Sequence, residues 1–186
     1  MPRKRDAEAT RERLLEAAFG EFAKHGLAGA RIDRIAVAAE TNKRMIYDYF
    51  GSKDALFQAV IDAAIERLFE AVPFTVEDLP AYTGRLFDVL SARPELLRLQ
   101  AWWHLTADAP SPSQLDSFRL QINDVAAAQR AGLIGDRLEP GDIVAFIGAI
   151  AAAWMSGAPG IRELLGDDTA KRRAAVVAAV AAITAP

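Results

Sequence analysis

Apolar side chains recur every three or four residues along most of the chain, which is the spacing of one face of an α-helix. The pattern is clearest near the N-terminus, where Leu14, Ala18 and Phe22 fall on one stripe. No stretch sustains the apolar and polar alternation of a half-buried strand. The sequence therefore predicts an all-α fold. Helices are expected at about 14–25, 32–39, from 42, from 52 to 73, and at about 76–92, 94–105, 113–131, 140–156 and 168–184.

Two of the predicted helices are short and stand on either side of a tight turn at Glu40 and Thr41. That outline is typical of a helix-turn-helix, whose second helix enters the major groove of DNA with its N-terminal residues at the base edges. Asn42 is a favourable N-cap, because its side-chain oxygen accepts a hydrogen bond from the backbone of the next turn. The cap places Lys43 and Arg44 in the first turn of the second helix.

Cations at two helix N-termini indicate an external anionic partner. The first turn of a helix carries partial positive charge, which disfavours a cation there by roughly 0.3–1 kcal/mol. Lys43 and Arg44 occupy such a turn together, and Lys53 does the same behind the predicted cap Ser52. Helix N-termini with a lysine bind phosphate groups. The sequence therefore predicts that these helix ends lie on a polyanion.

Two tyrosines extend the same surface. The hydroxyl groups of Tyr47 and Tyr49 are able to donate hydrogen bonds to phosphate oxygens without carrying charge. Two alternatives stay open at this point. Arg44 and Asp48, one turn apart, could form an ordinary surface ion pair. The tyrosines could be half-buried core aromatics with solvated hydroxyl groups.

The segments "LLEAAFGEFAKHG" and "IDRIAVAAETNKRMIYDYFGSKDALF" resemble the N-terminal DNA-binding domain of the tetracycline-repressor (TetR) family. The match spans residues 14–57 and rests on the Tyr-x-Tyr-Phe, Ser-Lys and Ala-Leu-Phe positions. The resemblance implies an all-α homodimer with a helix-turn-helix DNA-binding domain at residues 1–53. It also implies a helical domain at residues 54–186 that dimerises and binds a small ligand. Beyond residue 57 the resemblance is one of architecture.

The resemblance also assigns DNA contacts to individual positions. It implies that Lys43, Arg44 and Tyr47 lie on the recognition helix and contact DNA. It implies that Tyr49 and Lys53 contact phosphate groups. The full set of predicted DNA-binding residues is Arg31, Asn42, Lys43, Arg44, Tyr47, Tyr49 and Lys53.

The chain departs from the family pattern in two places. The family usually has a glycine and an aliphatic residue in the turn, where this chain has Glu40 and Thr41. The family's second helix usually opens with a Thr or Ser that caps the helix and contacts phosphate, whereas this chain has Ala30 and Arg31. We therefore expect Arg31 to contact the phosphate itself, on a helix that lacks the usual cap oxygen.

Charge is distributed unevenly along the 186 residues. Residues 1–55 contain 11 Lys and Arg against 9 Asp and Glu, a net charge of +2, and the remainder carries −5 of the total of −3. The chain has no cysteine, so neither a disulfide nor a thiolate metal site is predicted, and no cofactor is expected. The longest apolar run, Ile143 to Met155, is 13 residues, against about 20 for a membrane helix. No secretory signal follows the basic N-terminus, so a soluble cytoplasmic protein is expected.

Two other classes of function are open to an all-α chain: an enzyme, and an all-α protein-interaction module without DNA binding. The sequence has two histidines, His25 and His104, but it contains no nucleophile motif, no phosphate-loop glycine pattern and no pair of histidines at metal-binding spacing. No catalytic residue is therefore predicted. An interaction module would explain the helices but not the cations at two helix N-termini. The sequence favours a ligand-responsive transcription regulator, and a repressor over an activator.

Aromatic residues beyond residue 80 are candidates for lining a cavity that takes a mostly apolar ligand. Trp102 and Trp103 are adjacent and therefore point about 100° apart on a helix, so one is expected in the core and the other at a cavity. The alternative is that all of these aromatics are ordinary core residues. The predicted ligand-binding residues are Phe87, Trp102, Trp103, His104, Phe118 and Trp154.

Two of the later helices are predicted to form a homodimer interface. The helix at 140–156 is apolar on nearly every side, which the surface of a monomer would not tolerate. The helix at 168–184 contains "AAVVAAVAAI", whose small side chains let helices approach closely. Two copies of this helix pair would form a four-helix interface with two-fold symmetry.

Overall fold

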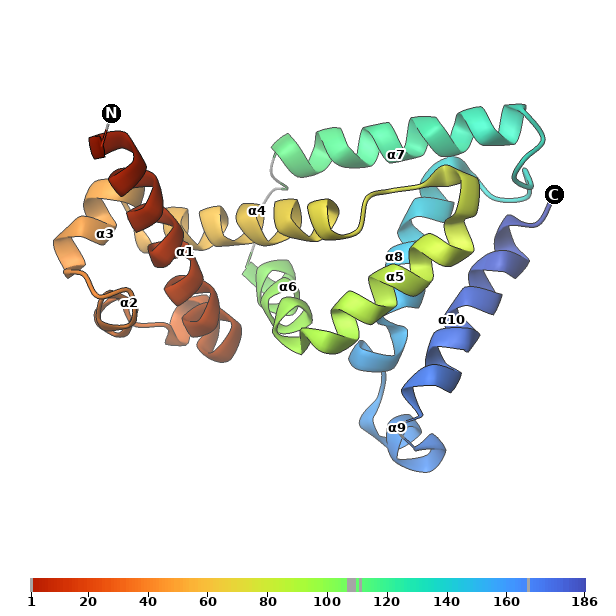
Figure 1. The fold of residues 1–186 in the computed structure, drawn as a ribbon. Helices are drawn as coiled ribbons and strands as arrows, with labels where there is room; N and C mark the ends of the chain where they lie inside the picture. Colours follow the sequence, from red (N-terminus) through yellow and green to blue (C-terminus); the bar gives the residue numbers. More distant parts are fainter. Residues whose placement is uncertain (1, 107–109, 111, 167) are drawn as a thin grey trace. The chain divides into compact units, whose positions relative to one another are not determined.

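The computed structural model describes residues 2–106, 110, 112–166 and 168–186. Over these residues the regular structure is helical and contains no strand, which confirms the predicted all-α fold (Figure 1). The chain forms two compact units. We call Met1–Arg67 with Arg98–Ala109 the N-terminal unit, and Leu68–Leu97 with Pro110–Pro186 the C-terminal unit.

Helices α1, α2 and α3 belong to the N-terminal unit, and α4 and α6 contribute residues to both units. The helices of this group are α1 (Pro2–Gly29), α2 (Ile32–Ala38), α3 (Lys43–Phe50), α4 (Lys53–Ala71) and α6 (Pro94–Thr106). The C-terminal unit holds the 3-10 turn η1 (Val76–Asp78), α5 (Leu79–Ala92), α7 (Pro112–Arg130), α8 (Pro140–Ser156), α9 (Pro159–Leu165) and α10 (Thr169–Thr184).

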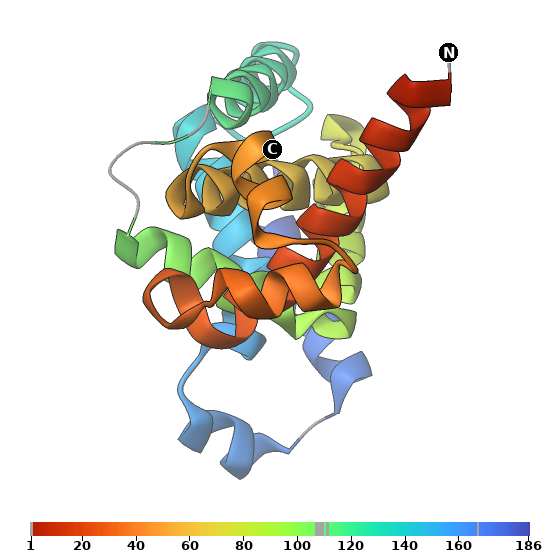
Figure 2. The ribbon, with the colours of Figure 1, turned by 90° about the vertical axis from the view of Figure 1, so that its left-hand side faces the viewer.

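In the N-terminal unit, α2 packs against both α1 and α3, and Figure 2 shows this unit as a ribbon. The stripe predicted on α1 is buried, with Leu14 and Phe22 fully inaccessible. Ile35 of α2 and Ile46 of α3 are also fully buried. The Phe22 ring meets Phe57 of α4 edge to face, with ring centroids 5.0 Å apart. This packing fixes the orientation of α3, the helix that carries the predicted DNA contacts.

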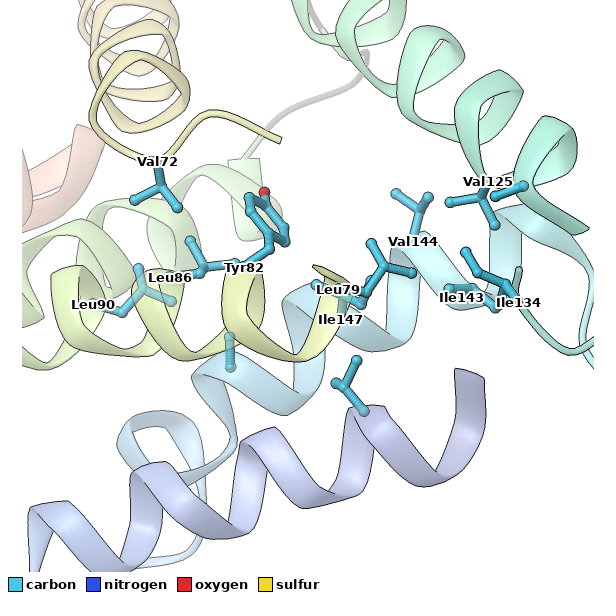
Figure 3. Packing of buried hydrophobic residues seen from close by; sticks show 13 residues of the cluster. Val72, Leu79, Tyr82, Leu86, Leu90, Val125, Ile134, Ile143, Val144 and Ile147 are labelled. Carbon is cyan, nitrogen blue, oxygen red and sulfur yellow. The ribbon is translucent and has the colours of Figure 1, made fainter. Parts of the chain in front are cut away.

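In the C-terminal unit, α5 packs against both α8 and α10, and α7 packs against α8. Their shared core includes Leu79 and Leu86 of α5, Ile143 and Ile147 of α8, and Val180 of α10. Figure 3 shows Leu79 of α5 beside Ile147 of α8 within this cluster. The buried faces of α8 and α10 lie toward this core, so their opposite faces are left to solvent in the monomer.

Several features of the helices differ from the prediction, beginning with α1, which starts at Pro2 and not near residue 14. The helix expected at 76–92 is divided, because Asp78 caps a new helix by accepting from Ala81 N at 2.9 Å. Helix α9 was not predicted; Pro159 stands in its first turn and Gly166, with φ 69°, ends it. The first helix turns sharply at Gly26, with φ 64°, and then resumes as far as Gly29.

Among the described residues, no single helix has both the length and the apolar character needed to cross a membrane. Only α8 and α9 taken together pass such a test, and they are bent by 73° where they meet.

Candidate nucleic-acid interface

The start of α3 is fixed by the predicted cap. Asn42 has an extended backbone, and its Oδ1 accepts a hydrogen bond from Met45 N at 2.9 Å. The prediction that Asn42 is the N-cap is confirmed, and Lys43 and Arg44 therefore lie in the first helical turn. The second predicted cap is also present, because Ser52 Oγ accepts from Ala55 N at 3.0 Å.

The two first-turn cations of α3 differ in how firmly they are held. Lys43 Nζ lies 3.2 Å from Asp33 Oδ1 on α2. Arg44 Nε lies 3.8 Å from Asp48 Oδ2, and its side chain is 90% exposed. The alternative of an Arg44–Asp48 ion pair is therefore present in a loose form, which contributes a few tenths of a kcal/mol at most. Such a pair leaves the Arg44 guanidinium able to reach an external acceptor.

The two tyrosines of α3 have different environments. Tyr47 is exposed and stands on the solvent side of the helix. Tyr49 is half-buried, and its hydroxyl donates to the backbone oxygen of Ala7 on α1 at 3.2 Å. Tyr49 therefore braces α3 against α1 in this structure, and its hydroxyl would have to leave Ala7 to donate to a phosphate.

Lys53 lies in the first turn of α4, as predicted. Its Nζ is 3.5 Å from the backbone oxygen of Ala28, at the end of α1. At that distance the hydrogen bond is weak. The ammonium group is therefore available to an anion that approaches the N-terminus of α4.

The missing cap of α2 is replaced by a carboxylate from α1. Arg31 makes no side-chain cap, but its backbone N–H donates to Glu21 Oε1 at 2.8 Å, and Arg34 Nε donates to the same oxygen at 2.8 Å. Burial alone would raise the pKa of Glu21, but the hydrogen bonds from Arg34 and Arg31 lower that pKa below its usual value. This contact is therefore intact at neutral pH and is lost as the pH falls through the lowered pKa. Arg31 keeps an exposed side chain at the start of α2.

Glu40 occupies a position that usually belongs to glycine. It has φ 52°, in the left-handed region, and the backbone N–H groups of Glu40 and Thr41 donate to Val37 O and Ala36 O. This is the hydrogen-bonding pattern of a Schellman motif, in which the left-handed residue is most often Gly. The departure from the family in this turn therefore stores backbone strain of about 1 kcal/mol.

We expect Glu40→Gly to raise the free energy of unfolding by about 0.5–1 kcal/mol, since glycine adopts this backbone without strain. The matched control is Glu40→Gln, which removes the same charge and keeps the side chain, and should give no comparable gain. Urea unfolding followed by circular dichroism measures both. An equal gain in the two variants would attribute the effect to charge and contradict the assignment of strain.

The predicted ligand residues are divided between the two units. Trp102, Trp103 and His104 lie on the part of α6 in the N-terminal unit. The remaining three lie in the C-terminal unit: Phe87 is buried, Phe118 meets Phe69 edge to face, and Trp154 carries the Arg172 guanidinium 4.2 Å above its ring.

The tryptophan pair divides as the helical geometry predicts. Trp103 is buried and Trp102 is 38% exposed. The indole N–H of Trp103 has no hydrogen-bond partner among the described residues, and the His104 ring lies 5.3 Å from the Trp103 ring. The Trp102 ring lies over Gly26, where an added Cβ would be only 2.7 Å from Trp102 Cδ2. Only glycine therefore fits beneath Trp102.

Sequence reasoning missed two residues of this region, Asp33 and Glu21. Each pairs with a cation or backbone group ten or more residues away. Neither pairing follows a helical spacing, so no sequence signal identified them.

Two packed helices joined by a tight turn, the second with a capped and cationic N-terminus on the solvent side, define a helix-turn-helix DNA-binding protein. The family described as "Bacterial regulatory proteins, tetR family" matches residues 14–60. The family described as "Tetracyclin repressor-like, C-terminal domain" matches residues 78–182. The chain thus belongs to the TetR family, which consists of transcription regulators and not of enzymes, and the resemblance seen in the sequence is confirmed.

Individual relatives agree with this assignment. The chain is 38% identical over 165 residues to the HTH-type transcriptional repressor SCO4008 of Streptomyces coelicolor, across 87% of this chain and 85% of that protein. A 60-residue match to the HTH-type transcriptional repressor NicS of Pseudomonas putida has 47% identity and covers 32% of this chain and 28% of that protein. The crystal structure of SCO4942 from Streptomyces coelicolor has 40% identity to this chain and a TM-score of 0.84, covering 95% of this chain and 98% of that one.

Proposed function

We propose that this TetR-family regulator is a repressor that binds a two-fold symmetric operator as a homodimer and is released by a small, mostly apolar ligand. The observation that carries the DNA-binding part is the first turn of α3, where a cap at Asn42 presents the largely exposed Arg44. In a helix-turn-helix this turn meets base edges in the major groove. A guanidinium there is suited to the two acceptors of guanine.

The predicted contacts divide into two roles within this proposal. Lys43, Arg44 and Tyr47 project from α3 and would contact bases or adjacent phosphates. Lys53 and Arg31 stand at the starts of other helices and would contact phosphates only. Asn42 acts by holding the start of α3. Tyr49 would reach phosphate only after leaving Ala7.

The functional division follows the sequence prediction, with DNA binding at residues 1–53 and ligand binding and dimerisation at residues 54–186. The outer faces of α8 and α10 support dimerisation. Phe146 of α8 is 43% exposed, and the alanines on the outer side of α10, among them Ala178, are exposed. Residues 174–186 contain no charged side chain. Interface cores are depleted in charge in the same way.

The buried indole N–H of Trp103, which has no hydrogen-bond partner among the described residues, supports a mostly apolar ligand that brings a hydrogen-bond acceptor. An unsatisfied buried donor costs about 1–3 kcal/mol, which an acceptor on the ligand would recover. Trp102 and His104 remain proposed ligand residues within the N-terminal unit, and Phe87, Phe118 and Trp154 remain proposed ligand residues within the C-terminal unit. Because its proposed partner is DNA, we also propose that the protein acts in the cytoplasm.

Contacts within the N-terminal unit offer a route from the ligand to α3. Trp102, next to Trp103 on α6, packs on Gly26 of α1. Arg67 of α4 is bonded to Glu12 and Glu16 of α1, with 3.0 Å from Nη1 to Glu16 Oε2. A ligand that displaces α6 or α4 would therefore move α1 and, with it, the recognition helix α3. In a dimer this would change the spacing between the two recognition helices, which must match a groove repeat of about 34 Å.

Reciprocity between ligand and DNA tests this function. Apolar metabolites are screened by thermal shift and tryptophan fluorescence, and each hit is repeated with operator DNA present. We expect hits that weaken DNA binding to bind correspondingly more weakly to the DNA complex, since the coupling free energy is shared. A hundredfold coupling corresponds to about 2.7 kcal/mol. Hits whose affinity is the same with and without operator would refute ligand control of DNA binding.

A further inference from the structure

A carboxylate stands beside one of the cations that is predicted to contact DNA. Asp33, in the first turn of α2, has Oδ1 3.2 Å and Oδ2 3.4 Å from Nζ of Lys43. The side chains are 74% exposed for Asp33 and 53% exposed for Lys43. The pair therefore links the two helices of the helix-turn-helix at the solvent face and not in the core.

The helix-turn-helix does not depend on this pair for its stability. An exposed ion pair contributes about 0–1 kcal/mol. Ile35 and Ile46 already fix α2 and α3 by complete burial. A carboxylate on a DNA-binding face also repels phosphates, which lowers affinity for every duplex. Asp33 therefore lowers DNA affinity, and the packing of α2 against α3 does not require a carboxylate at this position.

The Asp33–Lys43 contact differs from the Arg44–Asp48 ion pair on α3. Arg44 and Asp48 approach only to 3.8 Å, and both lie on one helix. Asp33 and Lys43 come from different helices, and both carboxylate oxygens are within 3.4 Å of the ammonium group. Asp33 thus restrains Lys43, whereas Asp48 leaves Arg44 unrestrained.

We propose that Asp33 is a specificity-determining residue of the DNA interface: it holds the Lys43 ammonium at the start of α3 for a base-edge acceptor and away from phosphates. This inference rests on the proposed function. Non-specific complexes depend almost wholly on contacts between cations and phosphates, so a lysine paired with Asp33 contributes little to them. On the operator, a positioned ammonium loses less conformational freedom when it meets an acceptor such as guanine O6 or N7. Asp33 therefore lowers non-specific affinity more than operator affinity.

The test compares full-length wild type with Asp33→Asn, using fluorescence anisotropy on a selected operator duplex and on a random-sequence duplex over a range of salt concentrations. We expect the affinity of Asp33→Asn for random duplex to rise about tenfold, with a salt dependence steeper by about one ion per subunit. Operator affinity should change by less than about threefold, so that the specificity ratio falls several-fold.

Two further comparisons distinguish a lysine held by Asp33 from a simple change of charge. Asp54→Asn removes the same charge from an exposed position in the first turn of α4 and should leave the specificity ratio close to that of wild type. In a Lys43→Ala background, Asp33→Asn should lose most of its effect on the ratio, because the pair is already absent. An effect of equal size in both backgrounds, or in Asp54→Asn, would overturn the inference.

The failure of this inference and the failure of the proposed function give different results. If wild type prefers no sequence over random duplex, the proposed function fails. If wild type prefers its operator and Asp33→Asn keeps the same specificity ratio, the inference alone fails.

Discussion

Ala178→Glu is expected to convert the protein from a dimer to a folded monomer and to reduce operator affinity by more than about a hundredfold. Ala178 is exposed on α10, on the side opposite Val176 and Val180, which are buried. In the proposed dimer this side chain meets a second copy of the apolar helix pair. An unpaired carboxylate buried there costs several kcal/mol, whereas in the monomer it stays in water.

The large expected effect of Ala178→Glu on DNA binding arises because the dimer joins two recognition units. Two recognition units joined in one dimer bind the second half-site as an intramolecular event, and a monomer loses that advantage. Light scattering at micromolar concentration measures the mass, and anisotropy measures operator binding. The matched control is Ala127→Glu, the same substitution at an exposed position of α7, which should remain dimeric. A dimeric Ala178→Glu protein with normal operator affinity would contradict the proposed interface.

Arg44→Ala is expected to weaken operator binding by about 1–3 kcal/mol per half-site and to relax base preference at one position in each half-site. The reason is that Arg44 is largely exposed in the first turn of α3 and held only loosely by Asp48. Because the dimer carries two copies, the losses add to about 2–6 kcal/mol when the half-sites act independently. Binding to a panel of operators with single base changes measures both effects.

Lys53→Ala serves as the comparison for Arg44→Ala. Lys53 is placed to contact phosphate, so its loss should weaken all duplexes alike and make the salt dependence shallower by about one ion per subunit. If Arg44 served only its ion pair, neither Arg44→Ala nor Asp48→Ala would change operator binding. That outcome would contradict the assignment of α3 as the reading helix.

Local signals in the sequence were sufficient to place the recognition helix. The apolar stripe of Leu14 and Phe22 is buried as predicted, and the caps at Asn42 and Ser52 make the expected hydrogen bonds. These features depend on residues within one or two turns of each other, where side-chain type determines backbone conformation directly. The order of the helices and the start of α3 could therefore be predicted.

Features that depend on distant contacts could not be predicted in the same way. Glu21 caps α2 from another helix, and Asp33 meets Lys43 across the turn. Helix α9 is only seven residues long and has too few turns to show a periodic stripe. That the Trp103 indole N–H has no partner within the part of the chain that the structure describes is likewise a property of its three-dimensional surroundings. Contacts between separate helices determine the pairings of Glu21 and Asp33, whereas α9, which buries none of its residues, is bounded by Pro159 and Gly166.

Selection of bound duplexes from a random pool by the full-length protein tests the central claim most directly. We expect the enriched sequences to share an inverted repeat whose half-sites lie about one groove repeat, 34 Å, or a multiple of it apart. The mass of the complex should correspond to an even number of subunits per site. Enrichment of asymmetric sites bound by a single subunit, or no enrichment at low salt, would contradict a homodimeric operator-binding regulator.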